Sequence, residues 1–152
     1  ASWTLKLGTD RTLGMSPILE RLAAIELFSQ LSAKELRKIA SFMTLIKIKA
    51  GRDLTVQGTP GREFMIIVEG EASVRRNGRL IASLGPGDFF GELAVVAGLP
   101  RTATVTAESE MLVETLNRRE FSSLLDASPR LAKKILVGAV KRLHDLEEGV
   151  VR

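Results

Sequence analysis

The chain has 152 residues, 45% of them hydrophobic and 26% charged, with a net charge of +4, which is the balance of a single soluble globular domain. Cysteine is absent and His144 is the only histidine, so disulfides, cysteine-ligated zinc, Ser-His triads and multi-histidine metal centres are excluded. The sequence has no apolar run near the ~20 residues of a membrane span, no secretory signal and no dense basic patch, so we expect a cytoplasmic protein that binds neither membrane nor nucleic acid.

Two short helices are predicted at the start of a domain that we expect to span residues 15–152, after a tail of residues 1–14. The first helix begins at Ser16-Pro17, with serine as N-cap and proline at the first helical position. Its apolar stripe continues through Ile25 and Leu27 to Phe28. The second helix begins at the capping box formed by Ser32 and Glu35.

Short strands are predicted between residues 45 and 116, where runs rich in Val, Ile, Thr and Phe alternate with glycine-centred turns. The strongest turn signal is Asn77-Gly78, which lies between the runs 72–76 and 79–84 and is typical of a type I′ hairpin. The other expected strands cover 46–48, 54–56, 64–68, 102–107 and 111–116, and Gly85 to Asp88 form another turn. Strands spaced this closely favour a closed β-roll, or jelly-roll barrel, so we predict a mainly β fold with flanking helices.

Helices return at the C-terminal end, where we expect a helical pair. Asn117 can cap a short helix, and Ser128-Pro129 begin a longer one. The apolar side chains of the longer helix share one face: Leu131, Ile135, Leu136, Ala139, Val140, Leu143 and Leu146. Covering the barrel is the favoured role of this face, and a homodimer seam is the alternative. The pairs Lys133-Lys134 and Lys141-Arg142 are expected to lie on its solvated face.

The residues that carry chemistry lie between 89 and 104. Gly91 allows the backbone to pass close to a ligand, and Glu92 precedes an apolar run that should form one helical turn. Unpaired N–H groups at the start of such a turn attract anions, and Arg101 can fork onto two phosphate oxygens. These groups suit a sugar phosphate inside a barrel. From the residues alone, an internal salt bridge between Glu92 and Arg101, with nothing bound, remains equally open.

A family resemblance favours the ligand. The motifs Phe-Gly-Glu-Leu-Ala at 90–94 and Pro-Arg-Thr-Ala-Thr at 100–104 resemble the phosphate-binding cassette of cyclic nucleotide-binding domains. Such domains occur in protein kinase A regulatory subunits, cyclic-nucleotide-gated channels and bacterial catabolite activator proteins. The resemblance runs from about Pro17 to Leu146 and includes residues 27–32, 67–71 and 85–92.

The resemblance implies a role for each matching residue. Glu92 would accept a hydrogen bond from the ribose 2′-hydroxyl, and Arg101 would pair with the cyclic phosphate. The N–H groups of Leu93, Ala94 and Ala103 and the Thr102 hydroxyl would complete the anion shell. Val74 and Ile81 would pack on the base, and both suit the barrel core in any case. Cyclic AMP is the expected ligand and cyclic GMP the alternative, because Thr102 fits both; no metal and no catalytic residue is expected.

The expected function is a ligand-gated switch that acts on an unidentified effector through the C-terminal helix. The alternative is a ligand-free domain that docks a protein partner through that helix. A cupin-type barrel enzyme is excluded by the single histidine, His144, which we expect to be an exposed helix residue. The residue that caps the base is not assigned. The chain begins with Ala1 rather than Met, so a fragment of a larger protein and a stand-alone sensor both stay open.

Overall fold

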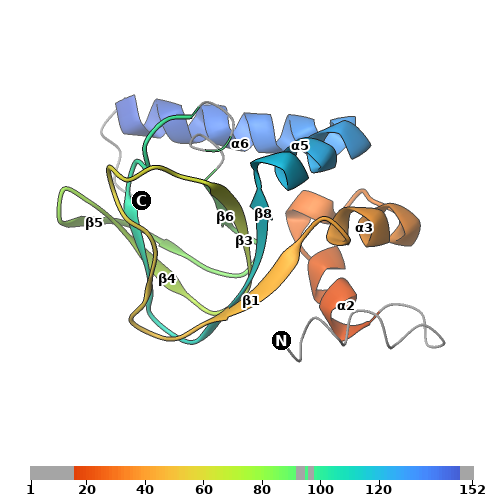
Figure 1. Ribbon diagram of the computed structural model, residues 1–152, viewed down its shortest axis with the longest axis horizontal. Helices are drawn as coiled ribbons and strands as arrows, with labels where there is room; N and C mark the ends of the chain where they lie inside the picture. The colour runs from red at the N-terminus through yellow and green to blue at the C-terminus, as the bar shows by residue number, and fades with distance from the viewer. Residues whose placement is uncertain (1–15, 92–94, 96–97, 148–152) are drawn as a thin grey trace.

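The structure is a computed structural model that describes residues 16–91, 95 and 98–147. The predicted tail, residues 1–14, lies outside these ranges. The chain begins with α2 (Pro17–Ala23), the 3₁₀ turn η1 (Glu26–Phe28) and α3 (Ala33–Ala40), and ends with α5 (Arg118–Ala127) and α6 (Pro129–Glu147). Figure 1 shows α2 and α3 on one side of the strands and α6 running along another side, next to α5.

Eight strands are present in the described part of the chain, in two four-stranded antiparallel sheets. The first sheet has the order β1 (Thr44–Ile48), β8 (Met111–Asn117), β3 (Glu63–Glu69) and β6 (Phe89–Phe90). The second has the order β2 (Asp53–Thr55), β7 (Thr104–Ala107), β4 (Ala72–Arg76) and β5 (Arg79–Leu84). The predicted β-roll with flanking helices is confirmed. Strand β6 was not predicted, because two residues are too few to show alternation.

Strand β3 separates two apolar cores because its two faces are both buried. Phe64, Ile66 and Val68 pack with the helices in the outer core, whereas Met65 and Ile67 face the inner core, between the two sheets. Alternate residues of a strand point to opposite faces, so an uninterrupted apolar run is what a strand buried on both sides requires. The inner core is small and contains Ile48, Met65, Ile67, Ala72, Val74, Phe90, Val105, Ala107, Met111 and Val113.

The predicted helix starts are confirmed by their caps. The hydroxyl of Ser16 accepts from the N–H of Leu19, and Ser32 and Glu35 form the complete capping box. The hydrogen bond from the Ser32 backbone is the main reason that the pKa of Glu35 lies below its usual value. Asn117 and Glu120 form a second capping box at α5. These motifs are local, which is why the sequence alone predicts them.

The first helix is shorter than predicted. It ends at Ala23, and Ile25 has extended backbone before η1 begins at Glu26. The break turns the chain so that Ile25, Leu27 and Phe28 are all buried in the outer core. In one continuous helix these three side chains would spread over about 160° of the circumference, which is wider than the narrow apolar stripe of a surface helix.

The apolar stripe predicted for α6 is only partly buried. Leu131 and Ile135 are buried, whereas the side chains of Leu136 and Val140 are exposed by 62% and 57%. The side chains of Leu143 and Leu146 lie outside the described part of the chain. The helix therefore contacts the domain through a narrower face than predicted, and Leu136, Val137 and Val140 form an exposed apolar strip.

The basic pairs of α6 are also corrected in part. Lys134 donates to the carbonyl of Glu26 at 2.7 Å, and Arg142 donates to the carbonyl of Phe89 at 2.8 Å. Lys133 and Lys141 are exposed, as predicted. One residue of each pair thus fastens the helix to the domain, and the other faces solvent.

Candidate functional site

Arg101 is the central residue of the candidate site, and it is 9% exposed. Its Nη2 donates to the carbonyl of Glu63, the first residue of β3, at 2.9 Å. Its backbone N–H donates to the carbonyl of Thr59, and its own carbonyl accepts from the N–H of Gly58, both at 2.9 Å. Main chain and side chain are thus held by the segment that leads into β3. This fixes the direction of the guanidinium.

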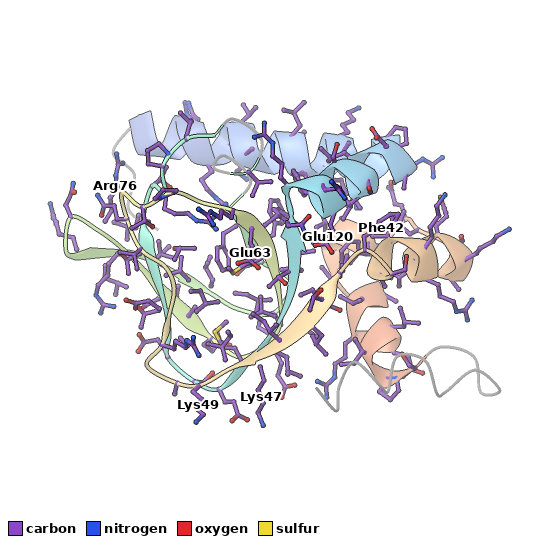
Figure 2. The ribbon with its side chains drawn as sticks, viewed as in Figure 1. Phe42, Lys47, Lys49, Glu63, Arg76 and Glu120 are labelled. Carbon is purple, nitrogen blue, oxygen red and sulfur yellow. The ribbon has the colours of Figure 1, made fainter. Side chains whose placement is uncertain are left out.

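Gly91 lies against this guanidinium and has no room for a side chain. A Cβ on Gly91 would lie 2.5 Å from Nη1 of Arg101 and 2.5 Å from the carbonyl oxygen of Glu63, and its φ is +94°. Both the contact and the positive φ therefore require glycine. Figure 2 labels Glu63 near the centre of the view, among the strands and below α6.

The helical turn predicted after Gly91 is described only at Val95. The N–H of Val95 donates to the carbonyl of Gly91 at 3.1 Å, and its side chain is 2% exposed in the outer core. Glu92, Leu93 and Ala94 lie outside the described residues. The predicted ribose contact and the alternative salt bridge between Glu92 and Arg101 both remain untested.

The two residues that follow Arg101 lead into β7. Thr102 is exposed and Ala103 is half-buried against the inner core. The carbonyl of Ala103 accepts from the hydroxyl of Thr55 at 3.0 Å, and the same hydroxyl accepts from the N–H of Val105 at 3.2 Å. This pair of bonds joins the end of β2 to the start of β7 and fixes the path of the chain after Arg101.

Val74 and Ile81 both contact the inner core from the hairpin of β4 and β5. Val74 is 9% exposed and pairs with Val105 on one side and Ala82 on the other. The register shifts between Val74 and Arg75, whose partners are Ala82 and Leu80, so Ile81 occupies a β-bulge. The structure thus brings Val74 and Ile81 to the same sheet as β7, which continues from Arg101.

Sequence reasoning missed three groups around this site. Glu63 and the loop residues Gly58 and Thr59 contact Arg101 through backbone atoms, which leave no side-chain signature in a sequence. Phe89, two residues before Gly91, packs against α6: a Cβ on Gly138 would lie 2.7 Å from its Cζ. Arg142 also lies over the Phe89 ring, 5.5 Å from its centroid. Gly138 lies inside an otherwise helical pattern, and such a glycine was the sequence signal that another group, here the Phe89 ring, packs closely against the helix.

Other features of the described residues lie away from this site. A hollow of about 620 Å³ is lined by α2, η1, the end of β3 and the turn before β6. The arginine that lines this hollow, Arg21, is ion-paired with Glu69, and Glu26 and Asp88 also line it, so the hollow is poorly suited to an anion.

In the described ranges, no cluster of three metal-ligating side chains is found, and no helix has the length and apolarity of a membrane span.

Comparison with known proteins identifies the family. Residues 45–128, which include the β-roll and Arg101, match the family model of the cyclic nucleotide-binding domain. The chain belongs to this family. The cyclic nucleotide-binding domain is 37% identical over 139 residues to a cAMP-dependent protein kinase regulatory subunit of Mycosarcoma maydis, a match that covers 81% of the chain and 26% of the relative. Across the five curated relatives compared, the domain spans between 26% and 34% of their length.

Solved structures agree on the fold. A structure described as Sp-2Cl-cAMPS bound to PKAR CBD2 has a TM-score of 0.74 and 26% identity to the domain, and the match covers 88% of this chain and 90% of that one. The regulatory subunit of a cAMP-independent protein kinase A from Trypanosoma brucei has a TM-score of 0.75 at 22% identity, covering 86% of this chain and 47% of that one. At 22% identity, the Trypanosoma brucei structure supports the fold of the domain and nothing about its ligand.

Proposed function

We propose that this domain is a non-catalytic sensor of cyclic AMP, with cyclic GMP as the less favoured ligand, and that Arg101 binds the cyclic phosphate. The observation that carries the proposal is a buried guanidinium, 9% exposed, held against a glycine that has no room for a Cβ. Nη2 already donates to the carbonyl of Glu63. A cyclic phosphate has two oxygens outside its ring, and these match the fork of a guanidinium directed by such a bond.

The remaining contacts follow the resemblance of the cassette. We assign Glu92 to the ribose 2′-hydroxyl, and the N–H groups of Leu93, Ala94 and Ala103, with the Thr102 hydroxyl, to the phosphate. The half-buried position of Ala103 and the exposed position of Thr102 are compatible with these roles.

The nucleobase is assigned to Val74 and Ile81. Both side chains contact the inner core, Val74 from β4, which pairs with β7, and Ile81 from β5, the next strand of the same sheet. An aliphatic surface there can pack on the flat face of a base. Cyclic AMP is favoured because three of the five relatives are cAMP-dependent protein kinase regulatory subunits and a similar solved structure holds a cAMP derivative. Thr102 does not discriminate between the two nucleotides.

Transmission of binding through α6 is supported by the contact between α6 and Phe89. Phe89 precedes Gly91 by two residues, and its ring touches Gly138 and lies under Arg142. A ligand that moves the cassette would therefore change the packing of α6 and bias a two-state equilibrium. Because the domain spans about a quarter of the Mycosarcoma maydis relative, we expect the effector to be another domain or another protein. The cytoplasm remains the expected compartment.

The alternative function is a ligand-free domain that docks a protein through α6. One observation favours it: Leu136, Val137 and Val140 are exposed by 62%, 57% and 57% on the same helix. A second copy of the chain could cover this strip in a homodimer. This alternative predicts no nucleotide binding, so titration separates the two functions.

The test is isothermal titration calorimetry of cyclic AMP and cyclic GMP against the parent, Arg101→Ala, Arg101→Lys and the control Arg37→Ala. Arg37 is exposed on α3. We expect Arg101→Ala to lose about two to three powers of ten in affinity, because it removes a forked, charge-assisted contact. Arg101→Lys should keep the charge but lose the fork, and bind with intermediate affinity.

Circular dichroism melts verify that each variant is folded, which matters because Arg101 is buried. Parent-like affinity in both Arg101 variants would contradict the assignment of the phosphate site. A parent that binds neither nucleotide would favour the docking function instead.

A further inference from the structure

Gln57, in the loop between β2 and β3, connects two parts of the candidate site that are distant in sequence. Its side-chain amide forms two hydrogen bonds with Asn77, the first residue of the hairpin turn between β4 and β5. Nε2 donates to Oδ1 of Asn77 at 2.9 Å, and Oε1 accepts from the Asn77 N–H at 2.8 Å. The loop is thereby fastened to the end of the hairpin that carries Val74 and Ile81.

The backbone of the same loop holds the segment around Arg101. The N–H of Gln57 donates to the hydroxyl of Thr104 at 3.0 Å. The next two residues, Gly58 and Thr59, form the two backbone hydrogen bonds with Arg101. Residues 57–59 therefore bridge the hairpin turn and the arginine, with hydrogen bonds at both ends of the bridge.

Glutamine has the chemistry that this bridge needs. Its amide donates and accepts in one plane, and Asn77, whose φ is +54°, offers it a side-chain acceptor and a backbone donor. Glutamate in its place would direct a second acceptor at Oδ1 of Asn77, and alanine would remove both bonds. Each exposed hydrogen bond is weak alone, but two bonds between planar groups also fix a separation and an orientation.

We propose that Gln57 is a positioning residue that sets the distance between the base-binding side of the site, Val74 and Ile81, and the phosphate-binding Arg101. A ligand that engages both sides depends on that distance, whereas a ligand that engages Arg101 alone does not. Gln57 therefore contributes to selection for a complete nucleotide over a bare cyclic phosphate. This inference rests on the proposed binding of a cyclic nucleotide.

The experiment is competition against a fluorescent cyclic nucleotide with two probes, cyclic AMP and ribose 3′,5′-cyclic phosphate without a base. We expect Gln57→Ala to lower the affinity for cyclic AMP by about 10-fold, because it removes two hydrogen bonds of modest net strength. The affinity for the base-free compound should fall by less than about 2-fold. Asn77→Gly keeps the positive φ and the backbone N–H but loses Oδ1, so it should give an intermediate loss for cyclic AMP. The control is Gln30→Ala, because Gln30 is an exposed glutamine in the turn after η1, and it should match the parent.

Hydrogen exchange without ligand supplies an independent readout, since Gln57→Ala should deprotect the Asn77 amide. The inference is overturned if Gln57→Ala binds both probes like the parent, or loses affinity for both equally, as a merely structural residue would. Arg101→Ala should weaken the binding of both probes. If it does so while the prediction for Gln57→Ala fails, the proposed function stays intact and only the inference about Gln57 is wrong. If the parent binds neither probe, both proposals fail.

Discussion

At the scale of single residues, Gly91 is the position where the candidate site tolerates least change. Its φ of +94° and the 2.5 Å approach of a Cβ to both Arg101 and Glu63 act together. Gly51 separates the two effects, because its φ is +89° and a Cβ there would have nothing within 4 Å. We expect Gly51→Ala to cost about 1–2 kcal/mol from backbone strain alone, and Gly91→Ala to cost about 2 kcal/mol more from overpacking.

Urea unfolding of both glycine variants measures the difference. Equal losses in the two variants would mean that the segment at Gly91 shifts to accommodate a Cβ without disturbing Arg101. A larger loss at Gly91 that is accompanied by weaker nucleotide binding would tie this glycine to the direction of the guanidinium.

At the scale of elements, α6 depends on a few contacts along a long helix. Leu131 and Ile135 are buried near its start, and Arg142 holds the distal part by a hydrogen bond to the Phe89 carbonyl and by its position over the ring. We expect Arg142→Ala to lower the free energy of unfolding by about 1–2 kcal/mol, because it removes a charge-assisted hydrogen bond and a cation–π contact. Lys141→Ala, at an exposed neighbour, should have little effect.

Hydrogen exchange along α6 is the measurement that locates the effect. Arg142→Ala should increase exchange in the distal part of the helix more than near Leu131. Identical protection in the Arg142 and Lys141 variants would show that the apolar contacts alone hold α6, and would remove Phe89 as the route between cassette and helix.

At the scale of the whole molecule, Glu114 lies in the apolar layer between the first sheet and the helices. It is fully buried in β8, where it pairs with Leu45 of β1 and Ile66 of β3. Neither of its carboxyl oxygens has a hydrogen-bond partner among the residues that the structure describes. This layer is covered by α2, η1, α3, α5 and α6. The charged residues of α2 and α3 are all exposed: Glu20, Arg21, Lys34, Glu35, Arg37 and Lys38.

Burial raises the pKa of Glu114 from 4.5 to about 7, which makes the stability of the domain depend on pH. The carboxyl group stays protonated in the folded state over a range where it ionises in the unfolded state. Stability is therefore full below pH 4.5 and falls as the pH rises to about 7. The loss relative to Glu114→Gln, which cannot ionise, should be about 3 kcal/mol between pH 4 and pH 8.

Chemical denaturation of the parent and Glu114→Gln across this pH range tests the prediction. Glu20→Gln is the control, because Glu20 is exposed on α2 and its removal should leave the pH profile of the parent unchanged. Parallel profiles for the parent and Glu114→Gln would mean that Glu114 finds a partner or water when it ionises.

Local features of the sequence determined much of this fold. The capping boxes at Ser32 and Asn117 and the turn at Asn77-Gly78 depend on hydrogen bonds and φ angles within a few residues, so the sequence predicts them without knowledge of the rest of the chain. Strands β4 and β5 have the predicted limits because that turn fixes their register. The motif around Arg101 likewise identified the family from residue types and spacing.

The tertiary structure decided which groups meet across long separations in the chain. The Glu63 carbonyl beneath Arg101, the pairing of Gln57 with Asn77, and the contact of Arg142 with Phe89 join segments far apart in sequence. It also decided that Leu136 and Val140 are exposed while Glu114 is buried, the reverse of what their polarity favours. A sequence pattern states which residues share a face of an element, but only the packing of the elements determines what covers that face.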